Sequence, residues 1–229
     1  MSKPLKKSNR IALGLAIAVS GALLAPMAQA STVNLKSEGA SVWGSGSNVW
    51  ARNVSYKLNG ASKSHGAGLF RLEETATGKS VLAWCIDLLH VLTLPADHDT
   101  EVASANAAQL GNIDKLFTSS YGEVDSADEA AGFQMALWEI MTDTGSADGL
   151  DLTKGGFQTT GSATPYTLAA DYLGRLGTAG TGGYKLTTYY NATSQNLVSA
   201  TPVPLPAAGL LLLGGLFGVG AMRSRRRKA

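Results

Sequence analysis

One cysteine and one glutamine are the residues of this sequence whose types and spacing could do chemistry together. Cys85 is the single cysteine of the 229-residue chain and lies in the apolar run 81–89. Gln134 is the one non-apolar member of a stripe that recurs at helical spacing through residues 130–141. A buried amide without partners costs about 1–3 kcal/mol, and a lone thiol outside the cytoplasm is prone to oxidation. Both liabilities disappear if the Cys85 sulfur condenses with the side-chain carbonyl of Gln134 and releases ammonia.

The product of that condensation is an internal thioester. It hides the thiol, removes the amide donors and leaves an activated carbonyl that an incoming amine can attack. The bond would also join positions 49 residues apart, a cross-link worth about 4 kcal/mol by analogy with disulfide loop closure. A reactive thioester, a purely structural cross-link, and a small buried Cys85 beside a hydrogen-bonded core Gln134 therefore remain open alternatives.

The elements that must position this pair are a strand and a helix. Strands are expected at residues 48–58, 68–73 and 79–94, separated by Gly, Ser and Asn turns. Residues 81–89 are almost continuously apolar, which predicts a strand buried on both faces. A helix is expected to begin at Ser126, which forms a capping box with Glu129 and precedes the stripe that contains Gln134.

The remaining segments complete an α+β prediction. Helices are expected at residues 104–119 and 165–176, and residues 184–198 return to a strand pattern. No internal repeat is visible. We predict one domain over residues 31–200, with a β-rich, sandwich- or barrel-like frame around a helical insertion.

Two short motifs resemble the signatures of bacterial thioester domains. Trp84-Cys85-Ile86-Asp87 is similar to the aromatic-Cys-x-Asp motif on a strand, and residues 133–139 are similar to the Gln-x-Ala-Leu-Trp motif on a helix. The resemblance implies a surface protein that covalently captures a nucleophile, typically a lysine amine, on a host or matrix molecule.

The resemblance also implies roles for four residues. Cys85 and Gln134 carry over as the bond-forming pair. Trp138, one helical turn after Gln134, would shield the bond from water, and Asp87 would lie on the same strand face as Cys85 and orient a donor. Phe133 stands where better-studied members have Thr.

The N-terminal residues 1–30 have the pattern of a secretory signal peptide. A basic start precedes an apolar stretch at residues 11–25, and Ala28-Gln29-Ala30 forms a small-x-small cleavage site. The stretch is too short to span a bilayer comfortably. The exported chain is therefore expected to begin at Ser31.

Residues 201–229 resemble the sorting signals of the PEP-CTERM class. The motif Val203-Pro204-Leu205-Pro206 leads into an apolar run at residues 207–222 and a cluster of arginines. The arginines would stay in the cytoplasm, which predicts a transmembrane helix with the preceding domain outside the inner membrane. The resemblance implies transient anchoring, processing by an exosortase, and release to the cell surface or extracellular matrix.

Charge and composition exclude several classes. Residues 31–202 hold ten Lys or Arg against seventeen Asp or Glu, a net charge of −7, which argues against nucleic-acid binding. One cysteine excludes an intramolecular disulfide framework and a multi-cysteine zinc site. No run of acidic residues matches a calcium loop, so no metal or other cofactor is expected.

The alternatives to covalent capture are a thiol hydrolase and a structural matrix protein. A thiol hydrolase would use Cys85 as nucleophile with His65, His90 or His98 as base, but a buried strand raises a thiol pKa rather than lowering it. A structural matrix protein without covalent chemistry fits the Gly, Ser and Thr content and the tail equally well. The sequence favours a protein that attaches covalently to a surface or matrix amine and is not an enzyme.

Overall fold

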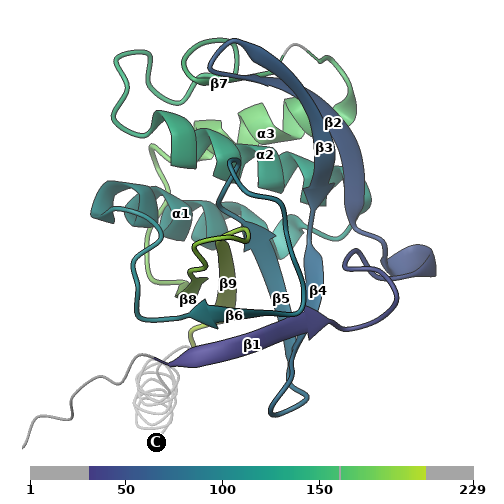
Figure 1. Cartoon of the computed structure of the whole chain (residues 1–229). Helices are drawn as coiled ribbons and strands as arrows, with labels where there is room; N and C mark the ends of the chain where they lie inside the picture. Colours follow the sequence, from purple (N-terminus) through teal and green to yellow (C-terminus); the bar gives the residue numbers. More distant parts are fainter. Residues whose placement is uncertain (1–30, 160, 205–229) are drawn as a thin grey trace, which may run out of the picture.

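The computed structural model of the chain describes residues 31–159 and 161–204 (Figure 1). The predicted signal peptide and the predicted membrane helix lie outside these residues, as do Leu205 and Pro206 of the sorting motif. Val203 and Pro204 lie inside them and are exposed. Within the described ranges, no helix is long and apolar enough to span a bilayer.

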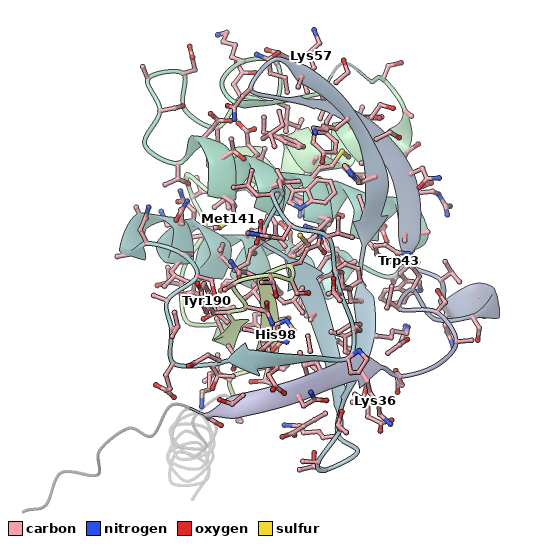
Figure 2. All side chains as sticks on the ribbon, viewed as in Figure 1. Lys36, Trp43, Lys57, His98, Met141 and Tyr190 are labelled. Carbon is pink, nitrogen blue, oxygen red and sulfur yellow. The ribbon has the colours of Figure 1, made fainter. Side chains whose placement is uncertain are left out.

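A curled, antiparallel six-stranded sheet forms the larger part of the β structure. Its strands are ordered β6-β1-β4-β5-β9-β8. The two outer strands approach each other at an isolated bridge between Asp99 and Tyr190, so the sheet curls toward closure; Tyr190 is labelled in Figure 2. The strands are β1 (Thr32–Ser37), β4 (Phe70–Glu74), β5 (Ser80–Cys85), β6 (Ala96–Asp99), β8 (Tyr184–Tyr189) and β9 (Leu197–Pro202).

A second, three-stranded sheet arches over the helices (Figure 1). It consists of β2 (Ala51–Leu58), β3 (Ala61–Gly68) and the short β7 (Phe157–Gln158), in the order β3-β2-β7. Asn59 and Gly60 connect β2 to β3 with positive φ angles of 50° and 82°, the geometry of a type I′ hairpin turn. A 3-10 turn (Gly46–Asn48) precedes the hairpin.

The helix α2 (Ala127–Asp143) is the centre of the molecule. It packs against α3 (Thr164–Arg175), against α1 (Ala107–Ser120), against the β2–β3 hairpin and against β5. Every residue from 130 to 140 is buried, as expected of a helix covered on all sides. A short 3-10 turn (Tyr121–Glu123) links α1 to the segment before α2.

The helix starts agree only in part with the predicted caps. Ser126 accepts a hydrogen bond from the Glu129 N–H at 3.3 Å, as predicted. The Glu129 carboxylate, however, accepts from the Asp125 N–H rather than from the Ser126 N–H. A complete capping box lies at the start of α1, between Asn106 and Gln109, and was not predicted.

Two strand predictions were too long. The strand predicted to continue to residue 94 ends at Cys85, because the Asp87 carboxylate accepts the N–H groups of the following loop and turns the chain. Leu89 and Val91 are 82% and 78% exposed, and Leu82 is exposed on one face of β5, so burial of the whole run on both faces was wrong. The strand predicted at 184–198 is instead the hairpin β8–β9.

The β-rich prediction with accompanying helices is confirmed. The frame is a curled six-stranded sheet with a separate three-stranded sheet, which replaces the coarser expectation of a sandwich or barrel. The helices follow β6 in the chain, and α3 precedes the closing hairpin β8–β9. This order places the end of the interior strand β5 directly against α2.

Candidate functional site

Cys85 and Gln134 contact each other through two hydrogen bonds. The Cys85 N–H donates to Gln134 Oε1 at 3.0 Å, and Gln134 Nε2 donates to the Cys85 carbonyl oxygen at 2.7 Å. Both residues are buried, with 2% and 1% of their surface exposed. The Gln134 amide is therefore satisfied without a covalent bond, and the cost of an unpartnered amide does not apply to it. The structure brings the two residues into contact, and the cross-link between them stays a prediction.

Aromatic residues immediately before each member of the pair fix this contact. Trp84, one residue before Cys85, packs against Phe133, one residue before Gln134, with ring centroids 4.7 Å apart. Phe133 also packs against Phe117 of α1 at 5.0 Å. The stack locks β5 and α2 at the level where the Gln134 amide meets the Cys85 backbone.

The thiol of Cys85 is held against the backbone of the loop that follows β5. It donates to the Asp87 carbonyl oxygen at 2.9 Å and accepts from the Asp87 N–H at 3.3 Å. Burial raises the pKa of the Cys85 thiol to about 12, against smaller opposing effects from the Asp87 backbone and the Trp138 indole N–H. A thiol with this pKa is protonated at neutral pH, which argues against a thiolate nucleophile that turns over substrates.

A cavity of about 70 Å³ lies beside Cys85. Because one water occupies about 30 Å³ of the liquid, this space admits a group the size of a primary amine with one or two carbons. Trp138 forms part of its wall and stacks on Tyr56 at 5.4 Å, the position that its predicted shielding role requires. The cavity is lined by Tyr56, His65, Gly66, Phe70, Cys85, Leu88, His90, Val91, Trp138 and Gln195.

The sequence predicted that Asp87 shares a strand face with Cys85, and the structure shows that it does not. It lies beyond the end of β5, and its carboxylate accepts from the Leu89 N–H at 2.8 Å and from the His90 N–H at 3.2 Å. The other carboxylate oxygen contacts His90 Nδ1 at 2.7 Å. Asp87 therefore organises the loop and an imidazole in the cavity wall; its expected place on the strand face of Cys85 was wrong, and its role in orienting a donor stays a prediction.

The β2–β3 hairpin supplies a part of the site of which the sequence analysis named only His65, as the base of a thiol hydrolase. The Tyr56 hydroxyl contacts His65 Nδ1 at 2.8 Å. Burial, and to a lesser extent the nearby Cys85, raises the pKa of Tyr56 to about 12. In β2, Val54 and Tyr56 are buried and the residues between and beside them are more exposed. This alternation is the one local pattern that indicates that Tyr56 faces the interior.

The other candidate residues lie elsewhere or have structural partners. His98 is buried on β6 between the carbonyl oxygens of Ala96 and Gln195, and it lies well apart from Met141 of α2 (Figure 2). Asp143 accepts from the N–H groups of Gly156 and Phe157. Within the part of the chain that the structure describes, no three His, Cys, Asp or Glu side chains gather where they could hold a metal ion.

Comparisons with known proteins add a distant structural likeness. No protein-family model matches the sequence, and no curated protein matches it. Among solved structures, the chain is similar to the N-terminal domain of the Streptococcus pyogenes pilus tip adhesin Cpa, with 18% identity and a TM-score of 0.41. The match covers 60% of this chain and 85% of that one. A likeness at this level assigns no activity, so the functional argument depends on the site.

Proposed function

We propose that this protein is an exported surface protein whose Cys85 and Gln134 form an internal thioester that covalently captures amine nucleophiles on a target surface or matrix. The observation that supports this most directly is the reciprocal pairing of Cys85 and Gln134 beside a cavity large enough for a primary amine. The protein acts once per bond and does not turn over, so it is not an enzyme in this proposal.

The pairing suits formation of the thioester. The Cys85 sulfur adds to the Gln134 side-chain carbonyl carbon, and negative charge develops on Oε1. That oxygen already accepts the Cys85 N–H at 3.0 Å, which acts as an oxyanion-stabilising donor. The carbon–nitrogen bond then breaks, and the amide nitrogen leaves as ammonia with the proton of the thiol.

In capture, the Cys85 sulfur is the leaving group instead of the nucleophile, and Gln134 keeps the new bond. An amine attacks the thioester carbonyl, the carbon–sulfur bond breaks, and the Cys85 thiol is restored. The target stays attached to Gln134 through a new amide bond. The cavity admits an unbranched primary amine such as a lysine side-chain end, and the net charge of −7 over residues 31–202 favours a lysine-rich partner.

The location follows from the predicted ends of the chain. The signal peptide of residues 1–30 exports the domain, the tail of residues 201–229 anchors it transiently in the inner membrane, and an exosortase-type enzyme processes it near the Val203–Pro206 motif. The captured amine then belongs to the cell surface or to the extracellular matrix.

A second function is supported by a specific observation. The Gln134 amide is hydrogen-bonded at both ends in the absence of any covalent bond, and this is also how a core glutamine is stabilised. The alternative is a non-covalent structural protein of the extracellular matrix, or one in which the cross-link only stabilises the fold. The contact between Cys85 and Gln134 is sufficient for either of these.

The intact mass of residues 31–202, purified without amine buffers, distinguishes these functions. We expect a mass one ammonia below the sequence value, and a methylamine adduct at Gln134 after treatment. Cys85→Ala and Gln134→Ala should each abolish both signals. Gln158→Ala is the matched control, because Gln158 bonds only a loop carbonyl and its loss should change neither. A full sequence mass with a freely alkylated Cys85 would support the non-covalent matrix protein.

A further inference from the structure

The loop after β5 holds a carboxylate–imidazole pair that the proposed function does not yet use. His90 Nδ1 lies 2.7 Å from Asp87 Oδ2. Asp87 is itself buried and fixed by the N–H groups of Leu89 and His90. A carboxylate on Nδ1 favours the tautomer that keeps the proton there and leaves Nε2 free to accept one. Among the described residues, nothing hydrogen-bonds to His90 Nε2.

This imidazole stands in the wall of the cavity that contains the Cys85 sulfur. In a space of about 70 Å³, an amine that reaches the thioester carbonyl is also within hydrogen-bond reach of the walls. The His90 side chain is 42% exposed, so one edge borders the cavity while another meets solvent. His90 therefore borders both the cavity and the solvent.

Capture of an amine requires a proton to move inside this cavity. The attacking nitrogen loses a proton when its new bond forms. The Cys85 sulfur must gain one, because burial raises the pKa of this thiol to about 12 and makes the thiolate a poor leaving group. Side chains that line the cavity beside Cys85 can transfer this proton.

We propose that His90, oriented by Asp87, is the general base and acid of capture, and carries the proton from the attacking amine to the Cys85 sulfur. His90 Nε2 takes a proton from the nitrogen as the carbon–nitrogen bond forms. It gives that proton to Sγ as the carbon–sulfur bond breaks, so the imidazole ends neutral and no other reactant is needed. Asp87 is a positioning residue. This inference depends on the proposed thioester.

The other titratable groups in the cavity wall are less suited to this transfer. Tyr56 has a pKa of about 12, so its hydroxyl is a weak acid and its phenolate is scarce at neutral pH. His65 faces the same cavity, but its Nδ1 is bonded to the Tyr56 hydroxyl rather than to a carboxylate. Only His90 combines a place in the wall with a carboxylate on its far nitrogen.

The test measures thioester content and capture rate separately on the full chain. Loss of ammonia at Gln134 reports the thioester, and the rate of methylamine addition to Gln134 reports capture. We expect His90→Ala to keep the thioester but to slow capture by about 10²-fold, the usual contribution of a general base. Added imidazole should restore much of the rate to His90→Ala. Asp87→Asn should also slow capture, without rescue by imidazole.

His65→Gln is the comparison variant, because it removes the other imidazole that lines the same cavity. It should slow capture far less than His90→Ala does, and added imidazole should not restore its rate. A His90→Ala variant that reacts at the wild-type rate, or slowing by His65→Gln alone, would overturn the role of His90 and leave the thioester standing. A wild-type chain that has lost no ammonia would instead refute the proposed function itself.

Discussion

In the proposed thioester, Cys85 would supply two groups to the same amide: its sulfur as the nucleophile and its own backbone N–H, which donates to the carbonyl oxygen. Bond formation would then be largely a property of one residue and its position at the end of β5. Phe133, immediately before Gln134, has a packing role, since it stacks on Trp84 and holds α2 in place.

Glu139, one residue after Trp138, is a buried carboxyl that no part of the site uses. It is fully buried, and neither of its oxygens has a hydrogen-bond partner. Burial and, secondarily, the charge of Asp143 raise the pKa of Glu139 from 4.5 to about 8. A raised folded-state pKa means that Glu139 stabilises the fold below pH 4.5. That stability is lost as the pH rises toward 8.

Glu139→Gln should therefore remove a pH dependence. Between pH 5 and pH 7 the wild type should lose about 3 kcal/mol of stability that the Glu139→Gln variant keeps. Urea unfolding at pH 5, 6 and 7 measures the difference. Glu101→Gln, at an exposed carboxyl, is the control and should follow the wild type. Parallel curves for Glu139→Gln and wild type would mean that Glu139 is ionised in the folded protein.

The position of Gln134 depends on how closely α2 approaches α3. A Cβ atom on Gly132 would lie 2.8 Å from the Leu168 Cβ and 3.0 Å from the Pro165 carbonyl oxygen. Both atoms belong to α3 or its first turn and cannot move away independently of that helix. The absence of a side chain at Gly132 thus sets the helix spacing two residues before Gln134.

Gly132→Ala should push the two helices apart and destabilise the fold by about 1–3 kcal/mol. Because α2 carries Gln134, the fraction of chains that lose ammonia should fall as well. Thermal unfolding and intact mass measure the two effects. Gly111→Ala in α1 is the matched control, since a Cβ there meets nothing within 4 Å, and it should be neutral or stabilising by up to about 1 kcal/mol.

The sequence predicted the elements of the site better than the cavity around it. The helix of Gln134 and the strand of Cys85 have strong local periodicity, so both were placed correctly. The end of β5 was missed because its apolar run continues into the loop, where Asp87 turns the chain. Tyr56 and His65 reach the site through a hairpin packed on α2, and such a long-range contact leaves no local pattern.

At the scale of the whole molecule, the proposed thioester joins the larger sheet to the central helix. It closes a loop of 49 positions, and opening it should cost about 4 kcal/mol by analogy with a disulfide. We therefore expect methylamine to lower the thermal midpoint of the wild type by several degrees. Cys85→Ala, already without the bond, should show no change with methylamine. An unchanged wild-type midpoint despite a complete methylamine adduct would mean that the bond adds no stability.

The position of Gln134 in the chain also has a mechanical meaning. In the proposed capture the target would be attached to α2, not to β5, so tension between the target and the end of β9 would not run along the backbone of residues 31–133. Within the sheet, β9 lies between β5 and β8 and pairs antiparallel with both. A force along β9 acts perpendicular to the hydrogen bonds that join this strand to β5 and β8. All of these bonds then bear the force together. The folded chain would resist such a force in shear, instead of opening one bond at a time.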